Sequence, residues 1–441
     1  MSLLPWPALW AAMILWVALG TFQFGFGISE LNALHSRFVG AAPTRECVGL
    51  TDDQYGYATA IYTCGGGLAS MIMIPLPMYV NVGRRTCLNA AAALALGGSL
   101  LLAVSTGLSL ILCGRLLQGL GAGIAVVQVP LYLQELAPPS IAGTIGICNQ
   151  LATVTGILVA QAVGTWAVLG HHAWQRVPQA SAVVAVLQLA FGLVYAVESP
   201  GWLDTHGTAH GVPAAPAAEA VRARLGLDYG ALPQHTHSND RDRATRAPSL
   251  GHGLRIVALT QAAQQLSGVN AIMYYSTGIL SALLPSMAPF VGLVITIINA
   301  AMTLPPLWLV DDPRFGRKRL LLLSAAGMGV FSLVLAYALA GAHSWLSGMA
   351  IVLMIACFSV GLGPVPFVLI PEVMPPAHVT TGSAMGLGLN WVLNLCVALS
   401  FQPLRRLLGA LDGHTGGMVF VVLGVLNLGF AVAMHRMYTP I

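Results

Sequence analysis

The stretch QAAQQLSGVNAIMYYST, residues 261–277, decides how this chain folds, because it sets several amide side chains inside an apolar segment of membrane-spanning length. Glutamine and asparagine amides are costly to place in hydrocarbon, so they must face a protein interior or a water-filled cavity. There they can meet a ligand rich in hydroxyl groups. The alternative is that they only pair with one another and hold neighbouring helices together.

The spacing of these amides also predicts a break in the helix. On a regular helix Gln261, Gln264 and Gln265 share about one third of the circumference, while Asn270 points elsewhere. A break near Gly268 would bring Asn270 back to the same side, and glycine permits one. Broken helices beside a cavity are typical of solute pathways in transporters.

Composition extends the membrane interpretation to the whole chain. Of the 441 residues, 56% are hydrophobic and 8% are charged, and the mean hydropathy is +0.78. Such a chain is predicted to be an all-α membrane protein with twelve transmembrane helices, each long enough to cross about 30 Å of hydrocarbon. The predicted spans are 8–27, 57–78, 88–106, 108–132, 141–167, 178–197, 254–283, 288–310, 320–341, 346–370, 380–403 and 416–435.

An internal repeat predicts two six-helix halves. GRR at 83–85 precedes VPLYLQELAPP at 129–139, and GRK at 316–318 precedes VPFVLIPEVMPP at 365–376 at nearly the same interval. Equal spacing of paired motifs is typical of duplicated transporter halves. We therefore expect an N-terminal half at 1–203, a cytosolic linker with short helices at 204–250 and a C-terminal half at 251–441. Within the linker, AAEAVRARLGL at 217–227 predicts a short helix that ends at glycine.

Both repeated motifs are predicted on the cytosolic side, where the basic residues gather. The basic turns and the acidic residues Glu135 and Glu372 come from different helices, so we expect ion pairs at the seam between the halves that hold the inner mouth closed. The alternative is that the basic turns only anchor the topology.

Other function classes find no support in the sequence. The seven cysteines are scattered and no Cys or His spacing fits a metal, so neither a metal nor a cofactor is expected. No nucleophile–base pair or nucleotide-binding loop indicates an enzyme. A formal net charge of +4 reflects membrane topology and does not indicate nucleic-acid binding.

The motifs resemble those of one family, the sugar porters of the major facilitator superfamily, which contains the GLUT-type hexose facilitators. The resemblance runs from QFGFGISELN at 23–32 to FQPL at 401–404, and QQLSGVNAIMYYST is its most specific motif. It implies a monomer in the bilayer that moves a small-molecule sugar by alternating access. It also implies hexose transport by facilitated diffusion. The location that the family implies first is the plasma membrane, and a vacuolar or other internal membrane is the alternative.

The resemblance further implies a set of site residues. Sugar hydroxyls would be held by Gln150, Gln264, Gln265, Asn270 and Asn299, with Asn390, Trp391 and Asn394 nearby. Tyr274 and Tyr275 would form an outer gate. GLGPVPF at 361–367 resembles a hinge, which can bend because proline removes backbone hydrogen bonds. Uncharged amides suit the role, because they donate and accept without the desolvation penalty of an ion.

Several positions depart from the family pattern. Ser359 stands where glucose facilitators usually carry glutamate, and Phe367 where they carry tryptophan, so fructose or another hexose also fits the expectation. The expected cytosolic charge network comprises Arg84, Arg85, Glu135, Glu198, Arg317, Lys318 and Glu372. It lacks the arginines usual at the positions of Ala142 and Gly201. With fewer ion pairs we expect the resting protein to favour an inward-open state.

The position of Gly27 bears on coupling. Proton-linked relatives carry an aspartate there, paired with the arginine that corresponds to Arg115, so its absence favours facilitated diffusion. Glu30 lies about one helical turn away, and burial raises the pKa of a carboxylate. A proton-coupled symporter that uses Glu30 is therefore one alternative, and a non-transporting sugar sensor is another.

Overall fold

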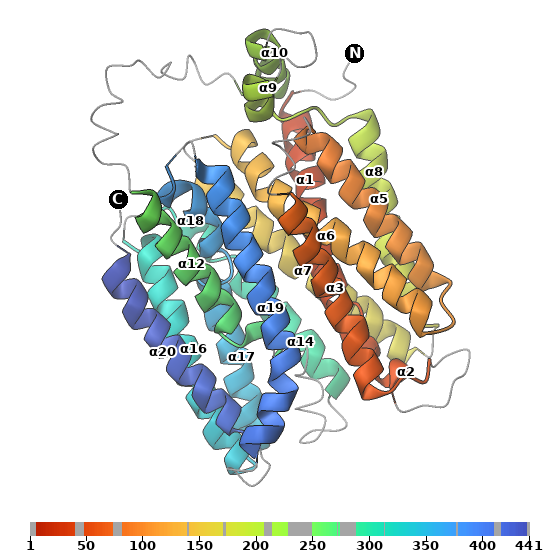
Figure 1. Cartoon of the computed structure of the whole chain (residues 1–441), viewed down its shortest axis with the longest axis vertical. Helices are drawn as coiled ribbons and strands as arrows, with labels where there is room; N and C mark the ends of the chain where they lie inside the picture. The colour runs from red at the N-terminus through yellow and green to blue at the C-terminus, as the bar shows by residue number, and fades with distance from the viewer. Residues whose placement is uncertain are drawn as a thin grey trace.

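The computed structural model describes residues 6–39, 48–73, 82–138, 141–170, 173–206, 214–227, 249–270, 272–273, 288–312, 314–375, 378–409 and 416–438. Within these ranges the chain forms helices and turns, with one isolated bridge between Val39 and Leu50. The helices gather into two bundles that lie side by side (Figure 1).

The first bundle contains the predicted N-terminal spans. Its long helices are α1 (Trp6–Ser29), α3 (Asp52–Ile72), α5 (Arg84–Ala103), α6 (Leu108–Leu136), α7 (Ala142–Leu169) and α8 (Arg176–Val194). The short η1 (Asn32–Leu34) and α2 (His35–Phe38) follow α1. At the opposite end of the molecule lie α9 (Pro200–His206) and α10 (Ala214–Leu225) (Figure 1).

The second bundle contains the C-terminal spans. Its elements are α12 (Leu250–Leu266), α14 (Ala288–Met302), α15 (Pro306–Leu309), α16 (Gly316–Ala340), α17 (Ser344–Val360), α18 (Val365–Val373), α19 (Val379–Gly409) and α20 (Met418–Met437). Helices therefore occupy the described part of each of the twelve predicted spans, and the spans at 288–310 and 346–370 are each divided into two helices.

The two bundles repeat the same packing. In the first, α5 packs on α6 and α8, and α1 packs on α7; in the second, α16 packs on α17 and α20, and α12 packs on α19. Across the seam α3 contacts α19 and α14 contacts α7, which is the exchange expected of two halves related by a pseudo-two-fold axis. This arrangement is the one expected of the twelve-helix architecture that the sequence predicts.

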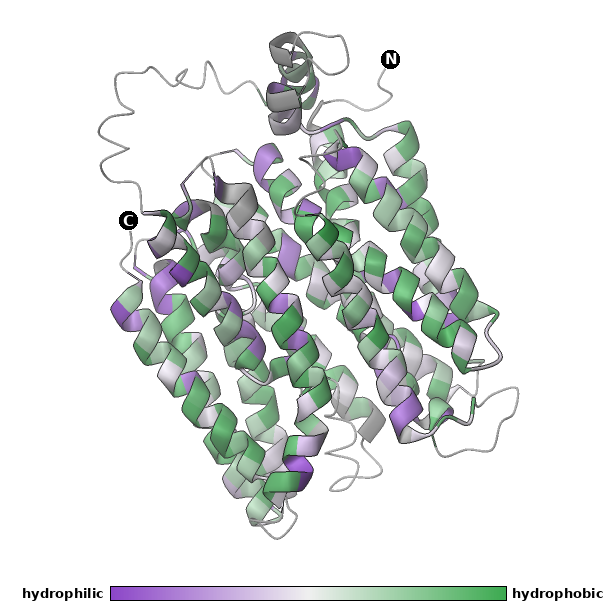
Figure 2. Ribbon diagram, viewed as in Figure 1, coloured by the Kyte–Doolittle hydropathy of each residue, from purple (hydrophilic) through white to green (hydrophobic). Residues whose placement is uncertain are grey.

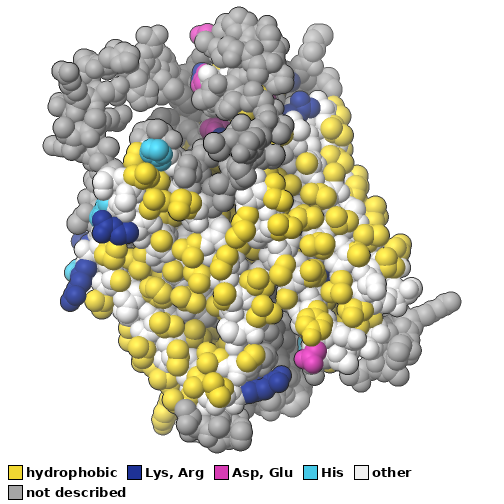
Figure 3. Space-filling model, in the orientation of Figure 1, with side chains coloured by type: hydrophobic (Ala, Val, Ile, Leu, Met, Phe, Trp, Pro, Cys, Tyr) yellow, Lys and Arg dark blue, Asp and Glu magenta, His cyan; other side chains and the backbone are white. Residues whose placement is uncertain are grey.

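The surface of the bundles suits a membrane. Nine helices in the described ranges are long and apolar enough to cross one, and the bent α19 makes a tenth. The helices are green around the bundles in Figure 2, and yellow apolar side chains cover the middle of the face in Figure 3, with basic groups toward its margins. Helix α12 is 17 residues long and buries Gln261, Gln264 and Gln265, which explains why composition alone does not mark it as a span.

Three helix breaks shape the interior. Helix α12 ends at Leu266 and Gly268 adopts φ +88°, which confirms the break predicted from the amide spacing. A four-residue turn at 361–364 separates α17 from α18, where the sequence predicts a hinge. The break between α14 and α15 was not predicted; Pro305 and Pro306 are the signal for it.

The linker is helical where it is described. Helix α10 ends at Leu225 and Gly226 adopts φ +66°, which confirms the short helix stopped by glycine. Helix α9 runs across the predicted domain boundary at residue 203. The boundaries of the three predicted regions therefore stay a prediction.

Candidate functional site: a cavity between the halves

A cavity of about 70 Å³ lies between the two bundles, with room for several water molecules. All eight residues predicted to contact a solute line it, although they come from helices far apart in the sequence: Gln150, Gln264, Gln265, Asn270, Asn299, Asn390, Trp391 and Asn394. The amides thus bond with one another and also border a void.

The amides of α12 and α19 form one hydrogen-bonded network. Gln265 Nε2 donates to Asn390 Oδ1 at 2.8 Å, and Asn390 Nδ2 donates to Gln264 Oε1 at 2.7 Å and to Gln261 Oε1 at 2.6 Å. Asn270 Nδ2 donates to Gln265 Oε1, which the break at Gly268 makes reachable. Gln261, which was left out of the predicted binding set, is buried within this network.

Trp391 joins the two halves at the cavity. Its indole ring lies edge-on to Phe24 of α1, with centroids 5.5 Å apart, and packs on Gly66 of α3. A Cβ at Gly66 would lie 2.3 Å from the ring, so only glycine lets α19 approach α3 this closely. The indole Nε1 is buried with no hydrogen-bond partner among the described residues.

Ser359, which stands where glucose facilitators usually carry glutamate, contacts the lining residue Asn299. Ser359 Oγ lies 2.8 Å from Asn299 Oδ1 and 2.7 Å from the carbonyl of Ile355, so its one O–H is shared between these two acceptors. Phe358 and Phe367 complete this part of the lining. Opposite, Gln150 and its neighbours Thr153 and Ile157 come from α7 of the first half. The predicted gate residues Tyr274 and Tyr275 lie outside the described residues.

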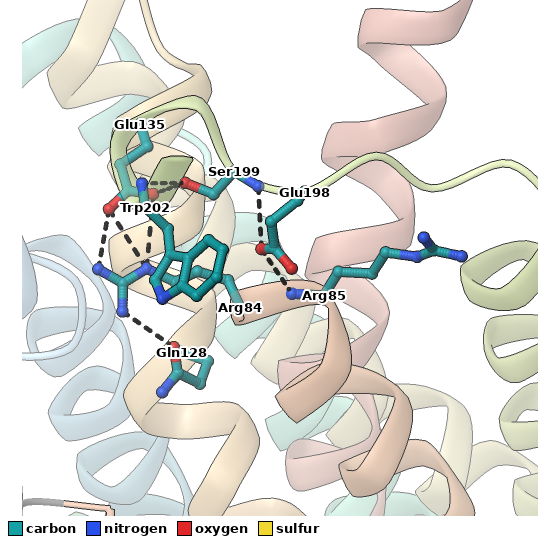
Figure 4. Close-up of polar contacts among 7 residues, drawn as sticks. All are labelled: Arg84, Arg85, Gln128, Glu135, Glu198, Ser199 and Trp202. Carbon is teal, nitrogen blue, oxygen red and sulfur yellow. Dashed lines mark hydrogen bonds and ion pairs between the residues drawn. The ribbon is translucent and has the colours of Figure 1, made fainter. Parts of the chain in front are cut away.

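The end of the first half that is predicted to be cytosolic carries a polar network (Figure 4). Arg84 of α5 pairs with Glu135 of α6 at 2.9 Å, and its other nitrogen donates to Gln128 at 3.2 Å. Ser199 Oγ donates to Glu135. Glu198 accepts from the backbone N–H of Arg85 and of Ser199, both at 3.0 Å.

The corresponding end of the second half carries the equivalent ion pair with one more acid. Arg317 of α16 pairs with Glu372 of α18 at 2.7 Å and with Asp311 at 2.9 Å. Lys318 Nζ donates to the carbonyl of His435. The expectation that the ion pairs of Glu135 and Glu372 cross the seam is wrong: each acid pairs with an arginine of its own half. Sequence spacing does not reveal this, because the pairing depends on which helices are neighbours.

Asp311 was missed by the sequence reasoning and does reach the seam. Its carboxylate lies against Gly143, where an added Cβ would approach Asp311 Oδ1 to 2.4 Å. Gly143 is in the first turn of α7, and a helix N-terminus favours a nearby carboxylate. An acid five residues before the GRK turn is the signal that would have found it.

Comparison with known proteins agrees with this architecture. The family model described as "Sugar (and other) transporter" matches residues 13–438. The chain belongs to that family. It is therefore a sugar transporter of the major facilitator superfamily, a multi-pass membrane protein and not an enzyme.

Individual relatives of the transporter are moderately similar. A probable metabolite transport protein of Saccharomyces cerevisiae is 29% identical, with 95% of this chain and 90% of that protein covered. Facilitated glucose transporter protein 1 of Caenorhabditis elegans is 31% identical, with 89% and 82% covered. The solved proton:xylose symporter XylE, bound to 6-bromo-6-deoxy-D-glucose, superposes with a TM-score of 0.80 over 97% of this chain and 96% of that chain, at 22% identity.

A buried ion pair lies within the first half of the transporter. Arg115 NH1 is 3.1 Å from Glu30 Oε2, and both side chains are 1% exposed. The guanidinium also lies 4.3 Å from the centre of the Tyr62 ring. The Tyr62 ring fills the space beside Gly27, since a Cβ there would lie 2.6 Å from the Tyr62 hydroxyl. Glu30 thus partners Arg115, and its second oxygen is buried without a hydrogen bond.

The carboxylates at the predicted cytosolic end of the transporter are partly removed from water. Burial raises the pKa of Glu198 above its ordinary value of 4.5, although backbone hydrogen bonds from Arg85, Ser199 and Arg84 oppose the shift. Burial also raises the pKa of Glu372, and Arg317 opposes it. Because each pKa is raised, both carboxyl groups release their protons at a higher pH than an ordinary glutamate.

Proposed function

We propose that this transporter carries hexoses of the glucose and fructose type across a membrane by facilitated diffusion with alternating access. One observation carries the proposal: the cavity between the halves is lined by amides and contains no charged side chain among its described lining residues. Such a wall exchanges the water shell of a sugar for hydrogen bonds of similar strength, so binding is weak enough for release.

The lining residues support hexoses as the substrate class. The eight residues named above act as sugar ligands in this proposal, and the C. elegans relative is named as a facilitated glucose transporter. Ser359 and Phe367 are smaller than the glutamate and tryptophan usual in glucose facilitators, so the wall admits the ring forms of fructose as well. We expect a monomer in the plasma membrane, with ion pairs within each half of the cytosolic network steadying the inner ends of the helices.

Counterflow in proteoliposomes tests the proposal. Labelled glucose and fructose are offered to vesicles preloaded with unlabelled sugar, and the transporter should accumulate at least one label transiently. Gln150→Leu removes an amide from the cavity wall and should raise the half-saturating sugar concentration. Gln161→Leu removes a buried amide that accepts from Ser29, away from the cavity, and serves as the matched control. No counterflow of either sugar by the wild type would refute the proposal and favour a sensor.

A second candidate is proton-coupled sugar symport. The observation that favours it is the Glu30–Arg115 pair, because a buried carboxylate with one unpaired oxygen is poised to take up a proton. Arg115 also donates to Gln118 at 3.2 Å, so the arginine keeps a partner when Glu30 is neutral.

An imposed pH gradient separates the two mechanisms. Facilitated diffusion predicts uptake that ends at equal concentrations inside and outside, whatever the gradient. Symport predicts uphill accumulation when the outside is acidic, which Glu30→Gln should abolish while it preserves counterflow. The Glu30→Gln comparison is meaningful only if that variant still folds, so its thermal unfolding is measured alongside.

A further inference from the structure

Gln264 occupies an unusual place in the amide network, because both of its N–H groups are already used. Its Nε2 donates to the carbonyl of Leu362 and to the carbonyl of Gly363, each at 2.8 Å. Both carbonyls belong to the four-residue turn between α17 and α18. Gln264 is 4% exposed, so water does not compete for these bonds.

The sequence explains why one of these carbonyls is available. In a continuous helix the carbonyl of Leu362 would accept from the N–H four residues later. That residue is Pro366, which has no N–H. The break therefore presents an acceptor without its helical partner, and α12 supplies the donor across the bundle.

These backbone contacts fix the direction of the side-chain hydrogen bonds. A carbonyl only accepts, so Gln264 must turn its NH₂ toward the break and its oxygen toward Asn390. Asn390 must then donate to Gln264 and turn its own oxygen toward Gln265. Gln265 must in turn accept from Asn270. The oxygen and NH₂ of an amide can ordinarily be exchanged by a flip of the group. Here the bonds of Gln264 to the two backbone carbonyls act as an anchor that fixes which way each of these amides points.

The fixed direction determines what the wall offers to a ligand. Gln265 and Asn270 each use one N–H in the network and keep the other. These two lining residues therefore offer N–H donors to the cavity. If the anchor were lost, the amides could turn over and present oxygens in the same places.

We propose that Gln264 is a positioning residue: its bonds to the α17–α18 break set the donor pattern of the amides that line the cavity, beyond any contact that Gln264 itself makes with sugar. This inference rests on the proposed hexose transport. It predicts that Gln264 affects recognition of several sugar hydroxyls at once, since the network that it directs extends over α12 and α19.

A panel of mono-deoxy glucose analogues tests the inference by competition against labelled glucose. In the wild type each deoxy analogue that loses a contacted hydroxyl should inhibit about 2- to 12-fold more weakly than glucose, as expected for one neutral hydrogen bond. The measured ratio is the inhibition constant of a deoxy analogue divided by that of glucose. The ionised side chain of Gln264→Glu cannot donate to the two carbonyls. In this variant the ratio should therefore fall toward one for two or more of the sugar hydroxyls. Pro366→Ala restores an N–H that competes for Leu362, and it should contract the same ratios to a smaller extent.

The alternatives give different patterns. If Gln264 acted only as a ligand, its variants would lose discrimination at one hydroxyl only. If its role were merely structural, they would lose thermal stability with every ratio unchanged. Either result overturns the inference. Gln161→Leu, the amide control, should leave the ratios unchanged. If the wild type binds no hexose, the proposed function fails and the network is tested without sugar.

The sugar-free test is a double-mutant cycle on thermal unfolding of the full chain in detergent. Gln264→Leu and Asn390→Leu should each lower Tm. The Tm of the double variant should be little lower than that of the less stable single variant, because either change already breaks the relay, that is, the chain of hydrogen bonds from Gln264 through Asn390 to Gln265. Additive shifts would contradict the relay whatever the substrate is.

Discussion

Substitution of Gly66 by alanine should push Trp391 out of place and weaken sugar binding. The added Cβ would lie 2.3, 2.6 and 2.7 Å from three atoms of the indole ring, whereas ordinary contacts begin near 3.4 Å, so the ring must move by about 1 Å. Overpacking of this kind costs about 1–3 kcal/mol. The higher helix propensity of alanine returns about 1 kcal/mol. The net effect on folding is a loss of up to about 2 kcal/mol.

The neighbouring Gly67 provides a matched control. A Cβ there would meet Trp391 at 3.4 Å, which is an ordinary contact, so Gly67→Ala should gain stability from propensity alone. The two variants differ by one position on the same helix and carry the same chemical change. Any difference between them reports the approach of α3 to α19.

The assay combines thermal unfolding with sugar affinity. Gly66→Ala should unfold at a lower temperature than Gly67→Ala. Its dissociation constant for glucose should rise about tenfold, equivalent to about 1.4 kcal/mol, because the displaced indole ring changes the shape of the cavity wall. Equal Tm values and equal affinities in the two variants would refute the reasoning.

Three further outcomes are expected. Arg115→Leu should destabilise the protein by about 3–5 kcal/mol, because it leaves Glu30 buried without a counter-charge. Adding Glu30→Leu to that variant should restore most of the lost stability. Equal stability of the single and double variants in thermal unfolding would argue against the ion pair. Folding raises the pKa of Glu198, so the stability that this group contributes is present at low pH and is lost as pH rises through the raised pKa. The Tm of Glu198→Gln should therefore increase relative to the Tm of the wild type as pH rises above 4.5. A Tm difference that does not change with pH would be inconsistent with the raised pKa. Alkylation of a cytosolic-side cysteine probe measures the inward-open state predicted from the reduced charge network, and an apo protein that is protected on the cytosolic side would contradict that prediction.

Much of the fold follows from the sequence, because apolar length and amide spacing act locally. The break at Gly268 could be predicted, since Gln261, Gln264 and Gln265 share a face that Asn270 reaches only if the helix stops. The paired GRR and GRK motifs likewise predicted the repeated halves. In both cases the physical signal lies within one segment of chain.

Pairing between segments was harder to predict. The partner of Glu135 depends on α5 and α6 being neighbours within one half, and sequence intervals do not report that. The link from Gln264 to Leu362 needs the side chain of one helix and the proline-induced gap of another. The sequence marks both features separately, and only the packing of α12 against α18 shows that they meet.

The ring of Tyr62 beside Gly27 has a consequence for how this protein can change. An aspartate at position 27 would meet the end of that ring, so the ring must shift or the residue at 62 must be shortened. The two positions therefore constrain each other. A library that varies both positions together is better suited to placing an acid at 27 than a library of single substitutions.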